Sequence, residues 1–507
     1  MEALFRFGHQ GDHGSNAWAV SGSKTADGAT LLAGDGHLAL GIPPIFFQMG
    51  LDTAVFGEAD DFSVMGLFLP GFPFLAVGTN GKIAWSQTYP RADVIDWYRE
   101  EVQLENGEPA ASFFEGAWHP LQRVEESYHV ASVLGGTEHD ETWARWVTFD
   151  GKWINDIEGR VIDPDEETPG AGEAVVTMLG DFIVPSDVDG DGVITAISVD
   201  YTAYDIGDLA GTVAGFQDAG SVEEFQAGVA TFVGYAQNLI TADVEGHIGF
   251  TPFTATPCRE YLPRDEAGEF VEGADPTLLL DGTKYGGFEV PLNENGVLDP
   301  ASAGDDPYRC VIPFEDFPRA LDPDSGWIAN ANNDPAGTTL DDTFGNDPWY
   351  IGGPWVPGYR ARAIVAGLEA AAVASSADIE AMARIQGHHG SQVGEEYVPV
   401  LLAAIERSKT LSAGAPTTPE EQRLAAAWDD RFGEVQTRLA AWVAAGAPAK
   451  SGVETFYASP TDDDRTAAVA TMIFNAWFRQ YLRDLFDDEA IDFAFQPASR
   501  HRGTVMR

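Results

Sequence analysis

Short apolar segments separated by turn residues recur in the first hundred residues, as they do in chains rich in strands. Residues 16–20 and 29–33 are segments of this kind, and residues 75–78 and 82–85 lie on either side of Asn80-Gly81. Asn-Gly between two such segments is a strong hairpin signal, because both residues tolerate the positive φ angles of a tight turn. The start of the chain is therefore predicted to be rich in strands.

The middle of the chain contains several kinds of sequence pattern. Residues 120–150 alternate apolar and polar positions and predict further strands. Residues 151–195 are rich in Gly, Pro and Asp and predict a long surface insertion. A helix is expected over residues 222–236, followed by a strand pair that turns at Glu245-Gly246. Residues 255–345 contain many Pro, Gly and Asp residues, which predicts irregular structure.

From Tyr359 onward, apolar positions recur at helical spacing in alanine-rich segments. The helices expected there cover residues 359–373, 376–386, 395–407, 418–445 and 465–486. A sheet-rich first part and a helical last part predict the α+β class. Because we find neither a fixed-period repeat nor a clear linker, we expect one interwoven unit rather than two independent domains.

Composition excludes several kinds of partner. The chain has 507 residues, 44% of them hydrophobic, so it is long enough for a large core. Its 29 basic and 80 acidic residues give a net charge of −51. Nucleic acid and anionic membrane surfaces both need clustered cations, and both are therefore excluded as partners. No stretch approaches the roughly 18 apolar residues of a membrane span.

The acidity is distributed along the whole chain, which suits a protein kept soluble in concentrated salt. From composition alone we infer a halophilic source, and specifically a halophilic archaeon. Cys258 and Cys310 allow one disulfide or none and do not fit a zinc framework. The first residues lack the apolar region of a signal peptide, so the sequence assigns no compartment. The pair His388-His389 lacks carboxylates or cysteines at metal spacing and is interpreted as structural.

The dipeptide Gly14-Ser15 is the candidate for chemistry. If the peptide bond before Ser15 were cut, its α-amine would be free, with a pKa of about 8. Such an amine accepts a hydroxyl proton near neutral pH, so one residue would be both nucleophile and base. The alternative is an ordinary serine at the start of a strand.

Seven segments then follow Ser15 in a particular order and spacing. They are residues 33–38, 70–73, 78–88, 93–98, 238–250, 328–335 and 359–364. Together they resemble the catalytic β-chain of the penicillin acylase (penicillin amidase) family, which belongs to the N-terminal-nucleophile hydrolases. The resemblance extends from about Ser15 to the C-terminus and is densest before residue 365.

The resemblance implies a four-layer αββα core with largely antiparallel sheets and a helical C-terminal part. It implies a precursor that cleaves itself, with residues 1–14 as the end of a spacer and residues 15–507 as the β-chain. It also implies hydrolysis of acyl amides, such as penicillin or cephalosporin side chains or N-acyl homoserine lactones, through an acyl-enzyme on Ser15. Phe46, Phe47, Phe68 and Phe72 are the aromatic side chains nearest the expected acyl pocket.

The resemblance also assigns roles to residues around Ser15. The backbone N–H of Tyr89 and the side-chain amide of Asn238 match the donors that hold the tetrahedral oxyanion. His37 matches a residue that touches the new N-terminus, through its side chain or main chain, and Arg259 matches an arginine that orients the asparagine and the amine. The alternatives are a turn-forming asparagine, a structural turn histidine and a surface salt bridge.

A structural calcium ion is implied as well, with no organic cofactor. Asp93 and Asp96, with the Ile95 carbonyl, match the family's calcium site, and hard oxygen ligands suit Ca²⁺. Residues 187–192 resemble the start of an EF-hand loop, but Ser198 stands where that loop needs a bidentate Glu. We therefore interpret residues 187–192 as a solvated acidic turn.

The chain departs from the family at its beginning. Family precursors carry an α-chain before the spacer, whereas fourteen residues precede Ser15 here. An α-chain is therefore expected to be encoded upstream, separate or missing. The alternative function is a non-catalytic, calcium-stabilised scaffold or binding protein that keeps the fold without the α-chain.

Overall fold

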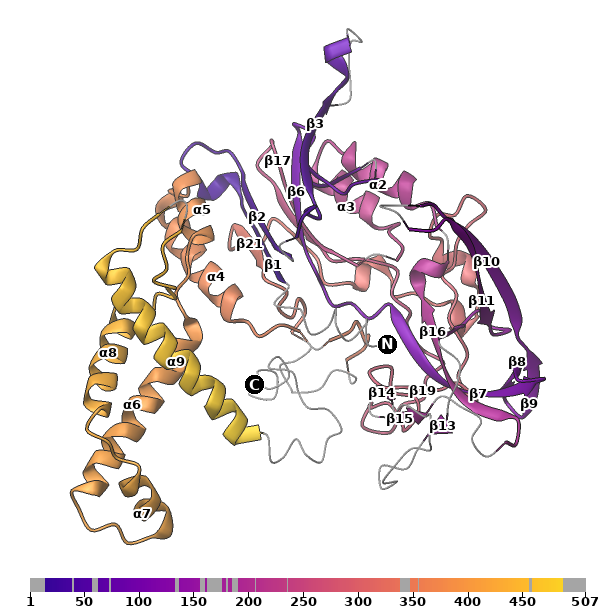
Figure 1. Ribbon diagram of the computed structural model, residues 1–507. Helices are drawn as coiled ribbons and strands as arrows, with labels where there is room; N and C mark the ends of the chain where they lie inside the picture. Colours follow the sequence, from indigo (N-terminus) through magenta and orange to yellow (C-terminus); the bar gives the residue numbers. More distant parts are fainter. Residues whose placement is uncertain are drawn as a thin grey trace. The chain divides into compact units, whose positions relative to one another are not determined.

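The structure is a computed structural model that describes most of the chain (Figure 1). The described residues are 14–38, 41–56, 63–72, 74–132, 136–155, 160–161, 176–178, 181–184, 190–205, 207–234, 236–337, 347–353, 355–455 and 458–486. The chain divides into two compact units. The first comprises Met1–Val356 and Ala372–Ala377, and the second comprises Pro357–Ala371 and Asp378–Arg507.

A seven-stranded antiparallel sheet is the centre of the first unit. Its strands, in spatial order, are β20 (Ala320–Leu321), β18 (Ile248–Thr251), β17 (Asn238–Asp243), β6 (Ile83–Thr88), β5 (Leu75–Thr79), β4 (Ser63–Phe68) and β3 (Phe47–Asp52). The predicted hairpin joins β5 and β6, with Gly81 at a φ of +86°. The Asn80 amide also donates to the carbonyls of Gln217 and Ala219, so this turn is fixed to the helix beside it.

Two helices, α2 (Leu209–Gln217) and α3 (Val222–Val229), cover one face of this sheet (Figure 1). Trp85 of β6 packs against Phe216 and Phe225 of the two helices, with ring centroids 6.5 and 6.0 Å apart. The helix expected over residues 222–236 is α3. It begins where the Ser221 side chain accepts the Glu224 N–H, and it ends seven residues earlier than expected.

A three-stranded sheet packs on the opposite face. It consists of β2 (Leu31–His37), β1 (Gly14–Val20) and β21 (Trp327–Asn330), all antiparallel. Small residues of β1 lie against β17 in the layer between the sheets, where Ala17, Ala19, Ile240 and Ala242 are buried. Side chains alternate across β17, because Leu239 faces the helices while Ile240 faces β1. Within this unit the order of layers is therefore helices, sheet, sheet.

A second large sheet extends the first unit. Its order is β10 (Gln122–Val130), β11 (His139–Val147), β12 (Trp153–Asn155), β16 (Val193–Tyr201), β7 (Ile95–Glu105), β8 (Glu108–Phe114) and β9 (Ala117–Pro120), and β19 (Leu280–Asp281) pairs in parallel with β7. The strands predicted within residues 120–150 are β10 and β11. The expected insertion, residues 151–195, includes β12, the start of β16, and a small sheet. The strands of that small sheet are β13 (Arg160–Val161), β15 (Asp181–Val184) and β14 (Val176–Met178).

Residues 255–345 are largely irregular where the structure describes them, as predicted. Short 3₁₀ turns recur through the first unit. They are η1 (Gly22–Lys24), η2 (Thr53–Phe56), η3 (Thr202–Tyr204), η4 (Pro300–Ala303), η5 (Pro307–Arg309), η6 (Phe314–Asp316) and η7 (Val373–Ser375).

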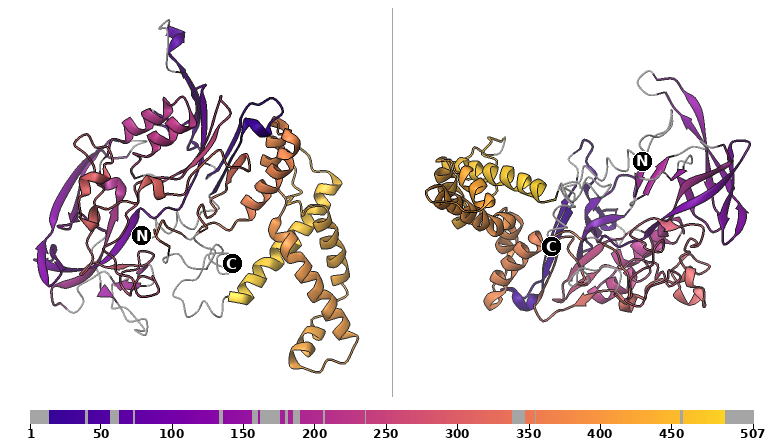
Figure 2. Two further views of the ribbon diagram at one scale, coloured as in Figure 1. Left: turned by 180° about the vertical axis from the view of Figure 1, so that it is seen from behind. Right: turned by 90° about the horizontal axis from the view of Figure 1, so that it is seen from below.

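The second unit is helical (Figures 1 and 2). Its helices are α4 (Tyr359–Ala372), α5 (Ile379–Gln386), α6 (Gln392–Ser412), α7 (Pro419–Ala426), α8 (Phe432–Ala444) and α9 (Asp462–Phe486). The single helix expected over residues 418–445 is wrong, because Asp429 accepts the Arg431 N–H in a tight turn that separates α7 from α8. None of the described helices is long and apolar enough to cross a membrane. The α+β class, the antiparallel sheets and the helical last part are confirmed.

Candidate active site

A cavity of about 850 Å³ opens in the first unit beside strands β2, β4, β5 and β6. Apolar side chains form much of its wall, namely Leu32, Leu38, Phe46, Leu67, Val77 and Trp85. Of the phenylalanines expected near the acyl pocket, Phe46 lines the cavity. Phe68 instead is 1% exposed in the core, with Phe47 packed against it at 6.1 Å between ring centroids. A mainly apolar wall of this size suits the organic part of a small ligand.

Glycines bring two strands of the wall close together. Gly66 of β4 lies opposite Gly78 of β5, and both line the cavity. A Cβ atom on Gly66 would collide with the Val77 carbonyl and the Gly78 Cα, and Gly78 has a φ of +154°. Side chains are therefore excluded at both positions by the backbone itself.

Ser15 lies in β1 at the wall of this cavity. It is 9% exposed and pairs with Gly36, while Gly14 pairs with His37. Both Gly14 and Ser15 line the cavity, so the peptide bond between them lies at its wall. The bond that is predicted to be cut and the hydroxyl that is predicted to react therefore share one site.

Asn332 holds the Ser15 nitrogen. Strands β1 and β21 pair with Ala17 opposite Asn330, and the same register continued by two residues places Ser15 opposite Asn332. Asn332 has a φ of +62°, a left-handed conformation that asparagine tolerates. Its side chain replaces the main chain as partner, since the Ser15 N–H donates to Asn332 Oδ1 at 2.7 Å. The Asn332 Nδ2 donates in turn to the Tyr89 carbonyl at 2.8 Å.

Asn238 lies at the start of β17, opposite Thr88, and is fully buried. Its Nδ2 is 3.0 Å from Thr88 Oγ1 and 3.2 Å from Asn330 Oδ1. The same Asn330 oxygen accepts the Thr88 hydroxyl at 2.5 Å and the Asn332 N–H at 2.8 Å. Asn330 therefore connects the predicted oxyanion donor to the segment that holds Ser15. Among the described residues, Asn238 Oδ1 has no hydrogen-bond partner.

Tyr89 and His37 lie close to Ser15 in different ways. Tyr89 follows β6, lines the cavity and is 56% exposed. His37 is the main-chain partner of Gly14, and its side chain is directed to Asp35, with Nε2 3.1 Å from Oδ2. The structure thus places the His37 main chain, more than its ring, beside the bond before Ser15.

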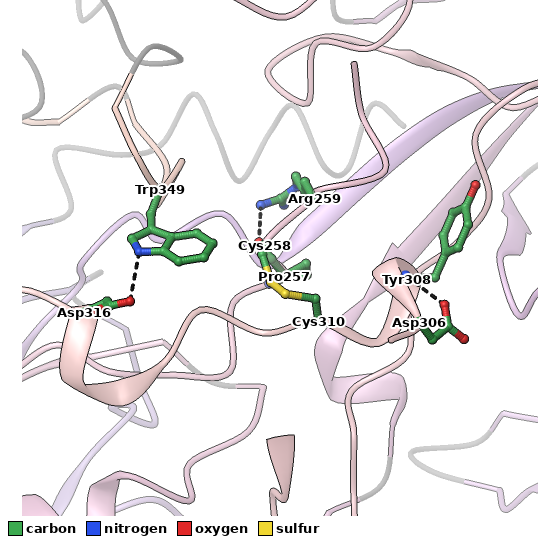
Figure 3. Close-up of a disulfide and its surroundings, with 8 residues drawn as sticks. All are labelled: Pro257, Cys258, Arg259, Asp306, Tyr308, Cys310, Asp316 and Trp349. Atoms are coloured by element: carbon green, nitrogen blue, oxygen red, sulfur yellow. Dashed lines mark hydrogen bonds between the residues drawn. A yellow bond between two sulfur atoms is a disulfide. The ribbon is translucent and has the colours of Figure 1, made fainter. Parts of the chain in front are cut away.

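Arg259 is held by carboxylates. It is 2% exposed, has a φ of +55°, and follows Cys258, which forms a disulfide with Cys310 (Figure 3). Its Nε lies 3.1 and 3.0 Å from the two Asp96 oxygens, and its Nη2 lies 2.8 Å from Asp96 Oδ1. Further bonds run to the carbonyls of Asp93 and Pro257. The hydrogen bonds of Arg259 therefore lead to the expected calcium ligands, not to Asn238 or Ser15.

The aspartates of the expected calcium site are both engaged by donors. Asp93 accepts the Tyr350 hydroxyl at 2.8 Å, and Arg259 Nη2 lies 3.5 Å from its other oxygen. Burial raises the pKa of Asp93 to about 6, although the charge of Arg259 lowers it. Burial alone would lower the pKa of Arg259, but the charges of Asp96 and Asp93 raise it well above its ordinary value.

In this arrangement the Arg259 guanidinium lies between the two aspartates, where the expected calcium ion would have to bind. Within the described ranges, no group of three or more His, Cys, Asp and Glu residues is arranged to hold a metal. Calcium binding by Asp93, Ile95 and Asp96 stays a prediction. In the second candidate loop, Asp187 and Asp189 lie outside the described residues. Ser198 is buried in β16, where it donates to Glu100 at 2.6 Å.

A second buried acid lies beside this cluster. Asp200 of β16 is opposite Asp96 of β7, is 4% exposed, and accepts the Phe288 N–H at 2.7 Å. Burial, with the charges of Asp205 and Asp96, raises the pKa of Asp200 to about 8. The folded protein therefore keeps a proton on Asp200 at neutral pH.

This proton makes stability depend on pH. Between an ordinary aspartate pKa near 4 and about 8, the folded chain holds a proton that the unfolded chain releases, so the free energy of unfolding falls as pH rises. We expect Asp200→Asn to remove this part of the slope and to stabilise the protein by about 1–2 kcal/mol at pH 8. Urea unfolding at pH 5 and pH 8 measures how the free energy of unfolding changes with pH. Asp324→Asn, at an exposed aspartate, is the matched control. Equal pH slopes for Asp200→Asn and wild type would contradict the assignment.

The predicted residues thus fall into two groups. Ser15 and Tyr89 both line the cavity, and Asn238 is connected to their segments by hydrogen bonds through Asn330 Oδ1. Arg259 belongs to the aspartate cluster. Sequence reasoning assigned no role to Asn332, although it lies in one of the matching segments. A second asparagine two residues beyond a strand end was the available signal, but its meaning depends on strand register. His388 and His389 are in the second unit, where His389 Nδ1 lies 2.8 Å from the Gly387 carbonyl.

The fold is that of the N-terminal-nucleophile hydrolases. It is similar to a thermostable penicillin G acylase from Alcaligenes faecalis, with a TM-score of 0.51 and 20% identity, covering 84% of this chain and 59% of that one. The family model for penicillin amidase matches residues 1–504. The chain therefore belongs to the penicillin amidase family, as its resemblance predicted.

Curated relatives fall into two named groups. Penicillin acylase 2 proenzyme from Pseudomonas sp. (strain SE83) is 28% identical over 83% of this chain and 42% of that protein. Penicillin G acylase from Escherichia coli is 23% identical over 63% of this chain and 29% of that protein. An acyl-homoserine lactone acylase from Pseudomonas aeruginosa is 28% identical over 23% of this chain and 13% of that protein. The chain spans less than half the length of these relatives.

Proposed function

We propose that the chain is the catalytic part of a self-processed amidohydrolase that cleaves acyl amides through an acyl-enzyme on Ser15. The observation that carries this proposal is the position of the Gly14–Ser15 peptide bond. It lies at the wall of the cavity of about 850 Å³, with its nitrogen 2.7 Å from Asn332 Oδ1. The curated relatives described above are named as acylases of two kinds, and one of them is named a proenzyme.

Processing comes first. The Ser15 Oγ attacks the Gly14 carbonyl carbon, a C–O bond forms, the C–N bond breaks, and the hydroxyl proton passes to the nitrogen. Water then hydrolyses the ester and releases residues 1–14. The Ser15 nitrogen becomes an amine with a pKa of about 8, which is basic enough to accept a proton near neutral pH.

Hydrolysis of the substrate repeats this chemistry at the same oxygen. The amine takes the Ser15 hydroxyl proton, through a water, as Oγ attacks the amide carbonyl carbon. The proton then passes to the leaving nitrogen as the C–N bond breaks, and water hydrolyses the acyl ester to the free acid. The mainly apolar wall of the cavity, which includes Phe46 and Trp85, receives the acyl chain.

The oxyanion is assigned to the Tyr89 N–H and the Asn238 carboxamide. Asn238 must turn one N–H away from Thr88 or Asn330 to reach it, and the contact to Asn330, at 3.2 Å, is at the long end of the hydrogen-bond range. Each such donor is worth about 100- to 1,000-fold in rate. The role of Arg259 is to fix the loop after Pro257, through Asp96.

The substrate class is an acyl amide whose acyl group is organic and apolar, such as a β-lactam side chain or an N-acyl homoserine lactone. A separate α-chain is the proposed partner, because the relatives are more than twice as long as the matched region. A structural calcium ion remains part of this proposal only if Arg259 moves from between Asp93 and Asp96.

Processing and hydrolysis are tested together. We would produce the 507-residue chain alone and with the segment encoded upstream of it, in low and high salt. Intact mass and a panel of p-nitroanilides, from acetyl to dodecanoyl and phenylacetyl, would then be measured. We expect loss of residues 1–14 and release of nitroaniline from at least one acyl chain. A chain that keeps residues 1–14 and cleaves no anilide under any of these conditions would overturn the proposal in favour of a non-catalytic scaffold.

A further inference from the structure

We infer that Asn332 is the positioning residue for the Ser15 amine: its Oδ1 holds one N–H, which directs the nitrogen lone pair to the Ser15 hydroxyl. The inference rests on the proposed function, since it concerns the nitrogen that processing releases. Asn332 is 2% exposed, and its side chain accepts the Ser15 N–H at 2.7 Å. It is a further residue for this reaction, acting through Ser15 and not on the substrate.

The position of Asn332 is fixed from three directions. Its N–H donates to Asn330 Oδ1 at 2.8 Å, and its Nδ2 donates to the Tyr89 carbonyl at 2.8 Å. Its backbone turns out of β21 with a φ of +62°, which ends the pairing with β1 and presents the side chain to Ser15. A carboxamide held at both its donor and its acceptor end has little freedom to rotate.

A neutral acceptor suits this position better than a charged one. A base must be unprotonated, and a carboxamide oxygen orients the amine while stabilising the ammonium form far less than a carboxylate would. Because Nδ2 holds the Tyr89 carbonyl, the Asn332 Oδ1 is the end that faces Ser15. The same carboxamide therefore fixes the amine and the backbone at Tyr89, where the proposed oxyanion donor lies.

The other ionisable residues near the amine are the same in every variant that the test compares. On β2 they are Asp35 and His37, which form a pair at 3.1 Å, and beyond β6 they are Tyr89 and Arg91, which line the cavity. On the segment of Asn332 itself, Asp334 follows two residues later. A shift that appears only when Asn332 changes is thus caused by Asn332.

The test is the pH dependence of kcat/KM for the p-nitroanilide that is cleaved fastest, measured on the full chain. In Asn332→Asp, a carboxylate next to the amine stabilises the ammonium form and raises the amine pKa. We expect the acid limb of the profile to move up by about one to two pH units, with part of the activity recovered at high pH. The remainder is lost because aspartate cannot donate to the Tyr89 carbonyl. A purely structural defect would lower the rate at every pH and leave the limb in place.

Two further variants make the test decisive. Asn333→Asp carries the same charge change one residue along, where Oδ1 accepts the Ala331 N–H and not the Ser15 N–H, and its limb should move far less. Asn332→Gly keeps the positive φ without strain and removes the acceptor, so kcat should fall about tenfold or more at every pH. If Asn332→Asp does not fold, Asn332→Gly decides: its kcat must fall while its urea unfolding midpoint stays close to that of the wild type.

The outcomes separate the two proposals. Hydrolysis by the wild type, with an acid limb that Asn332→Asp does not move or a kcat that Asn332→Gly does not lower, overturns the role of Asn332 alone. No hydrolysis by the wild type, with or without the upstream segment, refutes the proposed function and this inference with it.

Discussion

Replacing Ser15 with alanine is expected to lower kcat by at least about 10⁴-fold and to leave residues 1–14 attached to the chain. Without Oγ there is no atom to attack either the Gly14 carbonyl or the substrate carbonyl, so both reactions stop together. Intact mass and anilide hydrolysis measure the two losses. The fold should persist, because alanine is smaller than the buried serine it replaces and suits β1, where Ala17 and Ala19 already pack.

Ser21→Ala is the matched control for this prediction. Ser21 is also 9% exposed, but its hydroxyl donates to the Gly246 carbonyl at 3.1 Å, away from the cavity. Processing and hydrolysis should stay within about threefold of the wild type, since a single hydrogen bond is worth only about 1 kcal/mol. If Ser15→Ala kept more than a hundredth of the wild-type rate, another group would have to be the nucleophile.

Replacing Arg259 with methionine is expected to lower the free energy of unfolding by about 3–5 kcal/mol. Methionine fills similar volume but removes the guanidinium that contacts Asp96 at 2.8 Å, leaving a fully buried carboxylate without a counter-charge. Breaking a buried ion pair on one side costs more than removing both partners, because the remaining charge is neither solvated nor paired. Urea unfolding at pH 7, followed by tryptophan fluorescence, measures the change.

Arg431→Met provides the control. Arg431 contacts Asp429 at a similar distance, 2.7 Å, but Arg431 is 88% and Asp429 38% exposed to solvent, so no measurable change in stability is expected. The double variant Arg259→Met with Asp96→Asn should recover part of the loss. A loss below about 1 kcal/mol for Arg259→Met would show that Asp96 finds another source of positive charge, and a bound cation would then be the first to test.

Local patterns predicted the elements whose signals are local. The hairpin at Asn80-Gly81, the strand pair β17 and β18 around Glu245-Gly246, and most helices after Tyr359 follow from turn chemistry and periodicity, whereas the break between α7 and α8 was missed. The family was reached differently, by the resemblance of segments that stand in a fixed order along the chain. Helix α2 was missed, since its alternation of Gly, Ala and Thr carries little helical signal.

Contacts between segments that are distant in the sequence could not be predicted, and they determine how the site is arranged. Asn332 meets Ser15 across 317 residues of chain, and only the register of β1 with β21 brings them together. Arg259 meets Asp96 across 163 residues, so its preference for carboxylates over Asn238 was not visible in the sequence. In both cases the residue types were visible in the sequence, but strand pairing decides the neighbours of Asn332, and the course of the loop after Pro257 decides those of Arg259.

The pair of glycines in the cavity wall bears on how substrate preference can change. Neither Gly66 nor Gly78 has room for a methyl group, so a side chain can be introduced there only if the backbone of β4 and β5 moves. Under the proposed function, substitutions that change which acyl groups fit are therefore expected at the side chains that border this stretch, Leu67 and Val77 first. A search for variants that accept bulkier acyl groups would randomise those two positions and keep both glycines.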